Sequence, residues 1–193
     1  MDKIYIAAGA VVIVVIFVVF GFIASRKRDE AWRQLATELG ANFVKGGFRR
    51  SSLVQLPFKQ WTVNLDTYSV SSGDSSTTYT RVSAHLPDMQ GFWFALSKKG
   101  LVSKLDKALG TKEYPTGDAE FDKAFVIRGN DEAKIRALFA HQSIRQLFVT
   151  ERSLTAAIKK NVLSIELTGS IKDPNRLKAL FEMCKETLSL LEG

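Results

Sequence analysis

Five carboxylates fall within residues 117–134, the stretch GDAEFDKAFVIRGNDEAK. Carboxylates that converge can hold a divalent cation, and a facing pair can act as general acid and base. The spacing argues against both uses. Asp118 and Glu120 would lie in a turn, whereas Asp122 would point from one face of a strand formed by residues 121–128.

The end of the same stretch predicts a helix start. Asp131 and Glu132 would occupy the first turn, where the helix dipole favours acids, and Asn130 would be the N-cap. The five acids then point in at least three directions, so we interpret them as turn and cap residues around a buried strand. If the face that carries Asp122 is buried, this carboxylate should pair with Arg128 or a backbone amide, since unpaired buried charge is costly.

Few other side chains could do chemistry. His85 lies on the polar face of a predicted strand with Tyr79 and Arg81, and these three form the polar cluster that an unrecognised enzyme would use with Asp122. The chain has no second histidine at ligand spacing and no phosphate-binding or nucleophile-elbow motif, so we predict no catalytic residue, no cofactor and no metal ion. The only cysteine, Cys184, falls in an apolar helical stripe and is predicted to be buried.

The stretch GDAEFDKAFVIRGND, followed by a helix, two strands and a C-terminal helix, resembles the C-terminal half of a set of uncharacterised bacterial single-span membrane-anchored proteins. Those proteins are similar to one another in a Gly-Asp-x-x-Phe-Asp-x-x-Phe-x-Val/Ile pattern. The matching positions are Gly117, Asp118, Phe121, Asp122, Phe125 and Ile127. The likeness covers roughly residues 110–191. It implies a bacterial membrane-associated domain and transfers no catalytic residue, and we interpret the matching positions as structural.

An apolar run stands at the N-terminus. Residues 4–24 carry no charge and would form roughly 31 Å of helix, close to the ~30 Å hydrocarbon core of a bilayer. The sequence RKR follows directly, and Ile23 stands where a signal peptidase requires a small residue, so the pattern favours an uncleaved anchor over a cleaved signal peptide. We therefore predict a single transmembrane helix at residues 1–25.

The cations beside this run predict its orientation. Only Lys3 precedes the run, whereas Arg26, Lys27, Arg28 and Arg33 follow it. The positive-inside rule then puts the N-terminus outside and the remaining chain in the cytoplasm, as a single-pass protein of the inner (cytoplasmic) membrane. The four cations that follow the run are predicted to contact anionic lipid headgroups.

The net charge of +7 is concentrated near the predicted span, because residues 26–60 hold eight cations and three acids. The expected partner of this charge is the lipid bilayer, and no nucleic acid is expected. Gly21 and Ser25 form a small-xxx-small pair, which weakly favours self-association through the span.

Periodicity predicts an α+β fold, in which the N-terminal transmembrane helix is followed by a soluble domain of mainly antiparallel strands with packed helices. Residues 26–40 would form a basic juxtamembrane helix, and residues 41–193 a cytoplasmic α+β domain with a sub-boundary near residue 110. The strand candidates are residues 41–50, 58–70, 77–87, 91–97, 153–159 and 161–170. The helix candidates are residues 101–110, 131–139, 143–149 and a last helix that Asp173 caps and Pro174 begins.

The strand at residues 91–97 is apolar on both faces. Helices would cover one face, and the other face would either pack against further helices or line a groove. A lipid or small-ligand site would need an open apolar cavity lined by residues such as Trp61, Phe92 and Trp93. We therefore expect a membrane-anchored cytoplasmic interaction or accessory domain with a protein partner. The alternatives are a lipid or small-ligand binding domain and an unrecognised enzyme at the membrane surface.

Overall fold

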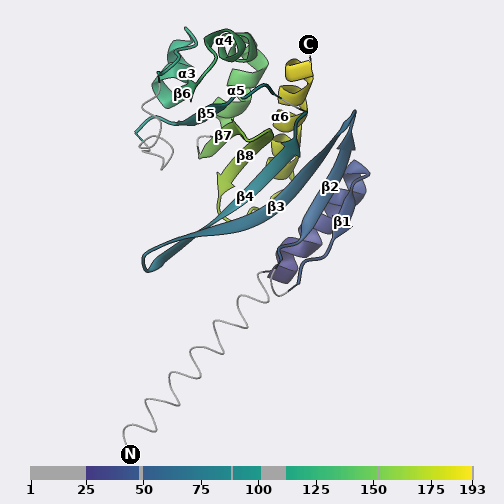
Figure 1. The fold of residues 1–193 in the computed structure, drawn as a ribbon. Helices are drawn as coiled ribbons and strands as arrows, with labels where there is room; N and C mark the ends of the chain where they lie inside the picture. Colours follow the sequence, from purple (N-terminus) through teal and green to yellow (C-terminus); the bar gives the residue numbers. More distant parts are fainter. Residues whose placement is uncertain (1–24, 48–49, 88, 101–111, 152, 193) are drawn as a thin grey trace, which may run out of the picture.

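One antiparallel sheet runs through the whole domain. The computed structural model describes residues 25–47, 50–87, 89–100, 112–151 and 153–192. Its eight strands lie in the order β1-β2-β3-β4-β8-β7-β5-β6 (Figure 1). The strands are β1 (Asn42–Val44), β2 (Leu53–Phe58), β3 (Trp61–Ser72), β4 (Ser75–His85), β5 (Phe94–Lys98), β6 (Phe125–Gly129), β7 (Leu154–Lys159) and β8 (Val162–Thr168).

The strand order brings distant parts of the sequence together. β4 and β5 follow one another in the chain, yet the β7–β8 hairpin lies between them in the sheet. β5 therefore pairs with β7 on one side and with β6 on the other. As a result, residues on both sides of position 110 form one continuous sheet.

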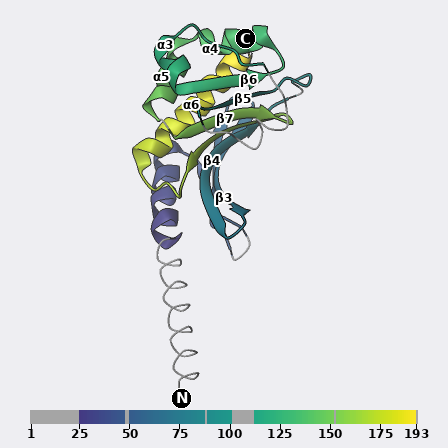
Figure 2. The same ribbon diagram turned by 90° about the vertical axis from the view of Figure 1, so that its left-hand side faces the viewer.

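The helices gather on one side of this sheet (Figure 2). They comprise residues 25–39, α3 (Ala119–Ala124), α4 (Glu132–Ala140), α5 (Gln142–Thr150) and α6 (Pro174–Glu192). The Asp173 side chain accepts a hydrogen bond from the backbone N–H of Arg176 at 2.9 Å. This contact confirms the predicted start of the last helix.

The core lies between the sheet and these helices. Alternate residues of the central strands, such as Val63 and Ile165, are fully buried, as are Phe181 and Cys184 of α6. The helix at residues 25–39 belongs to the same core, because Trp32 is 0% exposed and its indole N–H donates to the carbonyl of Ile171 at 3.0 Å. An indole that is both buried and hydrogen-bonded fixes this helix against the domain.

The predicted membrane anchor requires a correction. No helix in the described part of the chain is both long enough and apolar enough to cross a membrane. The predicted span at residues 1–25 lies, except for Ser25, outside the described residues. The predictions of a transmembrane fold and of a single-pass inner-membrane location are therefore withdrawn.

Two local predictions also change. Residues 58–70 do not form one strand, since the chain reverses at Lys59, whose φ of +52° places it in a tight turn between β2 and β3. Residues 121–128 do not form one strand either, since residues 119–124 are helical and the strand begins at Phe125. The helix predicted at residues 101–110 lies outside the described residues.

Candidate ligand-binding site

An open, mainly apolar pocket of about 320 Å³ lies on the face of the sheet opposite the helices. Side chains alternate between the faces of a strand, so Trp93, Ala95 and Ala157 point to this face, whereas Phe94 and Ile158 point into the core. Phe94 packs edge-on against Phe139 of α4, which identifies the buried face. The lining comprises Gly91, Phe92, Trp93, Phe94, Ala95, Ala157, Ile158, Lys159, Lys160 and Asn161.

Asn130 fixes the wall that carries Trp93. Its side-chain oxygen accepts from the backbone N–H of Trp93 at 2.9 Å, and its amide donates to the carbonyl of Gly91 at 2.9 Å. Gln90 and Gly91 have φ values of +52° and +74°, so the chain turns sharply just before this wall. The half-buried Trp93 is therefore held by its main chain, and it lines the pocket.

Asn161 fixes the opposite wall. Lys160 and Asn161 both have positive φ values, of 50° and 59°, and they form the two-residue turn that joins β7 to β8. The carbonyl of Asn161 accepts from the N–H of Leu86 at 2.8 Å, and its side chain accepts from the N–H of Met89 at 3.4 Å. These bonds tie the turn to the segment that leads to Trp93.

Small side chains continue from the pocket across the sheet. The pairings Ala95–Ala157, Ala157–Ser164 and Ser164–Ser83 form a single row over β5, β7, β8 and β4. With strands about 4.8 Å apart, this row runs roughly 14 Å from Ala95 to Ser83. An extended apolar chain that enters the pocket would meet no large side chain along this row.

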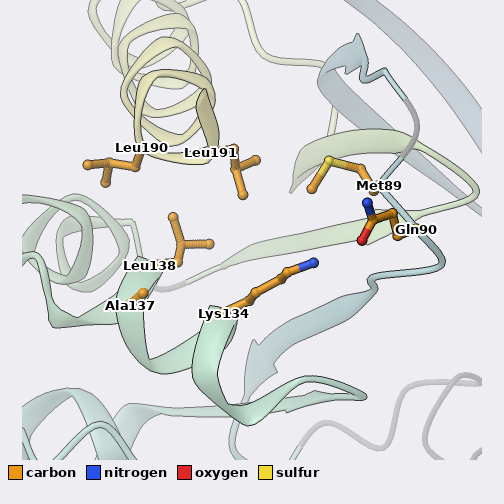
Figure 3. A pocket seen from close by; sticks show the side chains of 7 residues that line it. All are labelled: Met89, Gln90, Lys134, Ala137, Leu138, Leu190 and Leu191. Atoms are coloured by element: carbon orange, nitrogen blue, oxygen red, sulfur yellow. The ribbon is translucent and has the colours of Figure 1, made fainter. Parts of the chain in front are cut away.

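A second apolar pocket, of about 380 Å³, lies on the helix side of the molecule. In Figure 3, Leu190 and Leu191 of α6 face Leu138 of α4, and Lys134 extends toward the segment that contains Met89. The ammonium of Lys134 lies 3.9 Å from Asp131 and 5.5 Å from the centre of the Phe92 ring. This cation therefore already has partners within the domain.

The predicted ligand-lining residues divide between the pocket and the core. Phe92 and Trp93 line the open-face pocket. Trp61 does not, since it is only 6% exposed and packs with Phe58 in the core. Sequence reasoning missed three residues of this site: Lys159, Asn130 and Asn161. Asn161 could have been found from the Lys-Asn pair of the β7–β8 turn, because asparagine is common in such turns.

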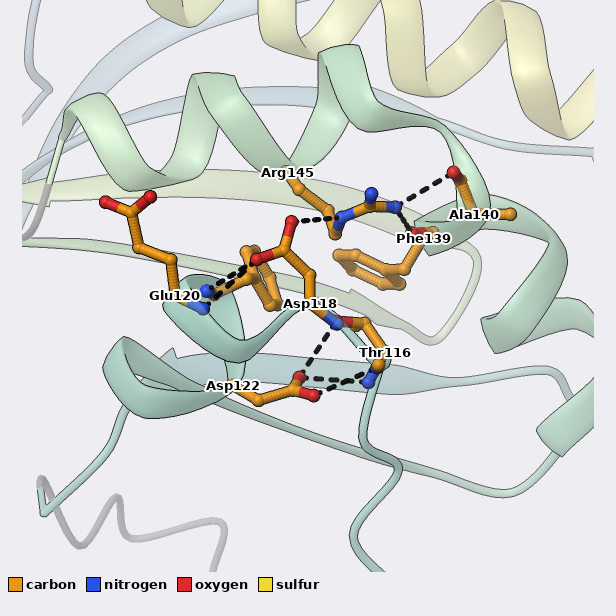
Figure 4. Close-up of polar contacts among 9 residues, drawn as sticks. Thr116, Asp118, Glu120, Asp122, Phe139, Ala140 and Arg145 are labelled. Carbon is orange, nitrogen blue, oxygen red and sulfur yellow. Dashed lines mark hydrogen bonds and ion pairs between the residues drawn. The ribbon is translucent and has the colours of Figure 1, made fainter.

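The acidic stretch at residues 117–134 organises the chain around α3 (Figure 4). Asp118 is the N-cap of α3, because its carboxylate accepts from the N–H groups of Glu120 and Phe121. Its other oxygen accepts from Arg145 Nε at 3.0 Å. Arg145 also donates to the carbonyls of Phe139 and Ala140, so one guanidinium joins α3 to the end of α4.

Asp122 lies on α3 and faces the turn that precedes it (Figure 4). It accepts from the backbone N–H groups of Thr116 and Gly117, at 2.9 and 3.0 Å, and from the Thr116 hydroxyl. Its partners are thus backbone amides and a hydroxyl, while Arg128 pairs with Glu113. Phe121 and Phe125, the apolar positions of the same pattern, are buried with their ring centres 5.2 Å apart.

The helix after this stretch starts one residue later than predicted. The N-cap of α4 is Asp131, which accepts from the N–H of Lys134 at 3.0 Å. Asn130 instead braces the Trp93 segment. The acids of the stretch therefore point apart, and no group of three or more metal-binding side chains exists among the described residues.

Of the polar cluster predicted at Tyr79, Arg81 and His85, the structure brings Tyr79 and Arg81 to one ring, that of Tyr68, and leaves His85 apart. Arg81 forms a two-point ion pair with Asp66, at 2.6 and 2.9 Å, and its guanidinium lies over the Tyr68 ring. Tyr79 stacks on the same Tyr68 ring, with the two ring centres 5.4 Å apart. His85 is exposed four residues further along β4, about 13 Å from Arg81.

Glu166 completes the group around Arg81. It accepts a hydrogen bond from the Tyr68 hydroxyl at 2.7 Å. Burial, followed by this hydrogen bond, raises the pKa of Tyr68 above its usual value. Tyr68 therefore stays protonated and donates its hydroxyl to Glu166. Arg81, Asp66, Tyr68 and Glu166 thus contact one another on the sheet.

The four cations predicted to contact lipid headgroups differ in their surroundings. Arg26 and Lys27 are exposed on the helix at residues 25–39. Arg28 pairs with Asp29 at 2.9 Å and lies over Trp32, and Arg33 lies over the Phe43 ring. Arg28 and Arg33 therefore already contact other side chains of the domain.

The comparisons with known proteins give one structural likeness. No family model matches the chain, and no curated protein matches it in sequence. Among solved structures, the mycobacterial trehalose monomycolate transport factor A, TtfA, superposes with a TM-score of 0.61 at 10% sequence identity. The superposition covers 86% of this chain and 95% of that one. The two proteins share a fold.

Proposed function

We propose that this domain binds the apolar part of a lipid or a similar amphiphile in the Trp93 pocket, and that it serves as an accessory module in lipid handling. The open apolar pocket on the uncovered face of the sheet is the observation that carries this proposal. Ligand sites are typically concave, mainly apolar and largely pre-formed. The Asn130 and Asn161 bonds hold both walls of this pocket in place.

The row of small side chains supports a long ligand over a compact one. A volume of about 320 Å³ accommodates only part of an acyl chain, and the row from Ala157 to Ser83 offers a path for the remainder. The fold shared with a trehalose monomycolate transport factor supports the accessory part of the proposal. A protein partner would be the component to which such a module presents its ligand.

The three tryptophans offer a direct test. Trp32 and Trp61 are 0% and 6% exposed, whereas Trp93 is half-buried at the pocket. A lysolipid with a spin label on its chain should therefore quench Trp93 selectively, because spin labels quench only at short range. We expect saturable quenching of part of the emission in the wild type and none in Trp93→Phe.

A pocket-filling variant separates this site from unspecific adsorption. Ala157→Leu places a larger side chain on the pocket floor without entering the core, and it should abolish the quenching. Thr155→Leu, on the same strand and face but outside the lining, is the matched control and should bind normally. Unchanged quenching in Ala157→Leu would refute the assignment of this pocket.

A further inference from the structure

We propose that the amphiphile of the Trp93 pocket is anionic, with its carboxylate or phosphate at Lys159 and Lys160. This inference rests on the proposed function and adds the chemical class of the headgroup. The last pair of the β5–β7 ladder is Phe94 with Ile158, and Trp93 and Lys159 are the next residues outward along the two segments. Both residues line the pocket, so one ligand in it can contact both side chains.

Lys160 adds a second cation at the same rim. It is exposed in the β7–β8 turn, where its positive φ and the bonds of Asn161 fix the main chain. Both lysines line the pocket. The alkyl part of a lysine side chain can cover apolar surface while its ammonium reaches water, so these residues can serve the apolar pocket and a headgroup together.

The charge at this rim is not neutralised within the described part of the chain. There, neither Lys159 nor Lys160 forms an ion pair, whereas Lys134 at the helix-side pocket has Asp131, and Lys178 has Glu38 at 2.6 Å. Two adjacent cations at the mouth of an apolar pocket attract an anion. For an anionic headgroup, the attraction should strengthen binding about five- to tenfold over a zwitterionic one.

The test uses the full chain and three spin-labelled probes with the same acyl chain. Labelled stearate presents a carboxylate, labelled lysophosphatidylglycerol a phosphate, and labelled lysophosphatidylcholine a zwitterion. Trp93 quenching gives the affinity of each probe, with Trp93→Phe as the background. We expect both anions, or the one whose headgroup fits, to bind five- to tenfold more tightly than the zwitterion.

The variants identify the residues responsible. Lys159→Gln/Lys160→Gln should remove the preference for anions and leave the zwitterion unaffected. Lys123→Gln/Lys172→Gln removes two exposed lysines elsewhere, lowers the net charge equally, and should keep the preference. Unchanged circular dichroism would show that each variant is folded.

The outcomes separate the two proposals. Equal affinity for all three probes, or an anion preference that survives Lys159→Gln/Lys160→Gln, would overturn the headgroup assignment and leave the apolar pocket standing. No Trp93-dependent quenching by any probe would overturn the proposed function itself. Loss of the preference in both double variants would assign it to net charge and would likewise overturn the role of Lys159 and Lys160.

Discussion

At the scale of single residues, Asp118 shows how a sequence that resembles a catalytic motif performs a structural task. Its carboxylate caps α3 and pairs with Arg145, which in turn caps the end of α4. The Phe121 backbone N–H, followed by Arg145, lowers the pKa of Asp118 below its usual value. The ionised carboxylate is therefore the form that the fold stabilises.

The lowered pKa of Asp118 predicts that the stability of the fold depends on pH. A carboxylate with a lowered folded-state pKa stabilises the fold above its unfolded-state pKa, and that contribution is lost as the pH falls through the folded-state value. Asn can also cap a helix but does not ionise, so the urea midpoint of Asp118→Asn should fall less between about pH 5 and pH 3 than that of the wild type. Glu120→Gln, which removes a neighbouring charge but no cap, is the control and should follow the wild type.

Cys184 provides a second prediction at this scale. It is the only cysteine, it is 0% exposed, and burial raises its pKa to about 12. Because the thiolate is the reactive form, a thiol reagent at about pH 8 should modify native protein only as fast as the fold opens. Full reaction within seconds in the absence of denaturant would show that the side chain is accessible.

At the scale of elements, the helix at residues 25–39 is a component of the fold. Trp32 fills the space between this helix and the segment before α6, where its indole binds the Ile171 carbonyl. Ser52 contacts the same helix, because its hydroxyl donates a hydrogen bond to Asp29 at 2.8 Å. The helix is therefore fixed both at Trp32 and at Asp29.

Replacing Trp32 should reveal how much the domain depends on this helix. Trp32→Ala should lower the free energy of unfolding by about 3–5 kcal/mol, through lost burial and an empty space in the core. Trp32→Phe retains most of the apolar surface but leaves the Ile171 carbonyl without its indole donor, and should cost about 1–3 kcal/mol. Urea denaturation measures both changes, and Gln34→Ala, at an exposed position of the same helix, should change the value by less than about 0.5 kcal/mol.

Elements with a clear period were predicted from the sequence, and ambiguous ones were not. Polar and apolar residues alternate along β4 and β8, and these strands lie where expected. Phe121 and Phe125 are four residues apart, and this spacing fits one face of a strand and one face of a helix equally, so it does not distinguish α3 from a strand. The turn at Lys59 was missed because neither Lys59 nor Gln60 is a residue that marks such turns.

At the scale of the whole molecule, the strand order could not be predicted. It depends on pairing between segments far apart in the chain, and local periodicity carries no information about such pairs. The pocket follows from that order, because only the pairing of β5 with β7 brings Ala95 to Ala157 and places Trp93 and Lys159 in the lining of one pocket. The sequence could name Phe92 and Trp93 as lining residues, but it could not name their partners.

The continuous sheet predicts that the domain unfolds as one unit, despite the sub-boundary suggested near residue 110. Trp32 and Trp61 report on the first half of the chain, and Cys184 reports on the second. Because β5 and the β7–β8 hairpin join the halves, tryptophan emission and Cys184 labelling should give the same urea midpoint. Two separate midpoints would indicate that the halves fold independently.

The two outer strands of the sheet have a consequence for behaviour at high concentration. β1 has only three residues, and β6 is flanked by a short segment in which Tyr114 donates its backbone N–H to Ile127. Long bare edge strands recruit strands from other molecules and lead to fibrils. Neither edge of this sheet presents a long unpaired strand, so the domain should stay free of fibrils at high concentration.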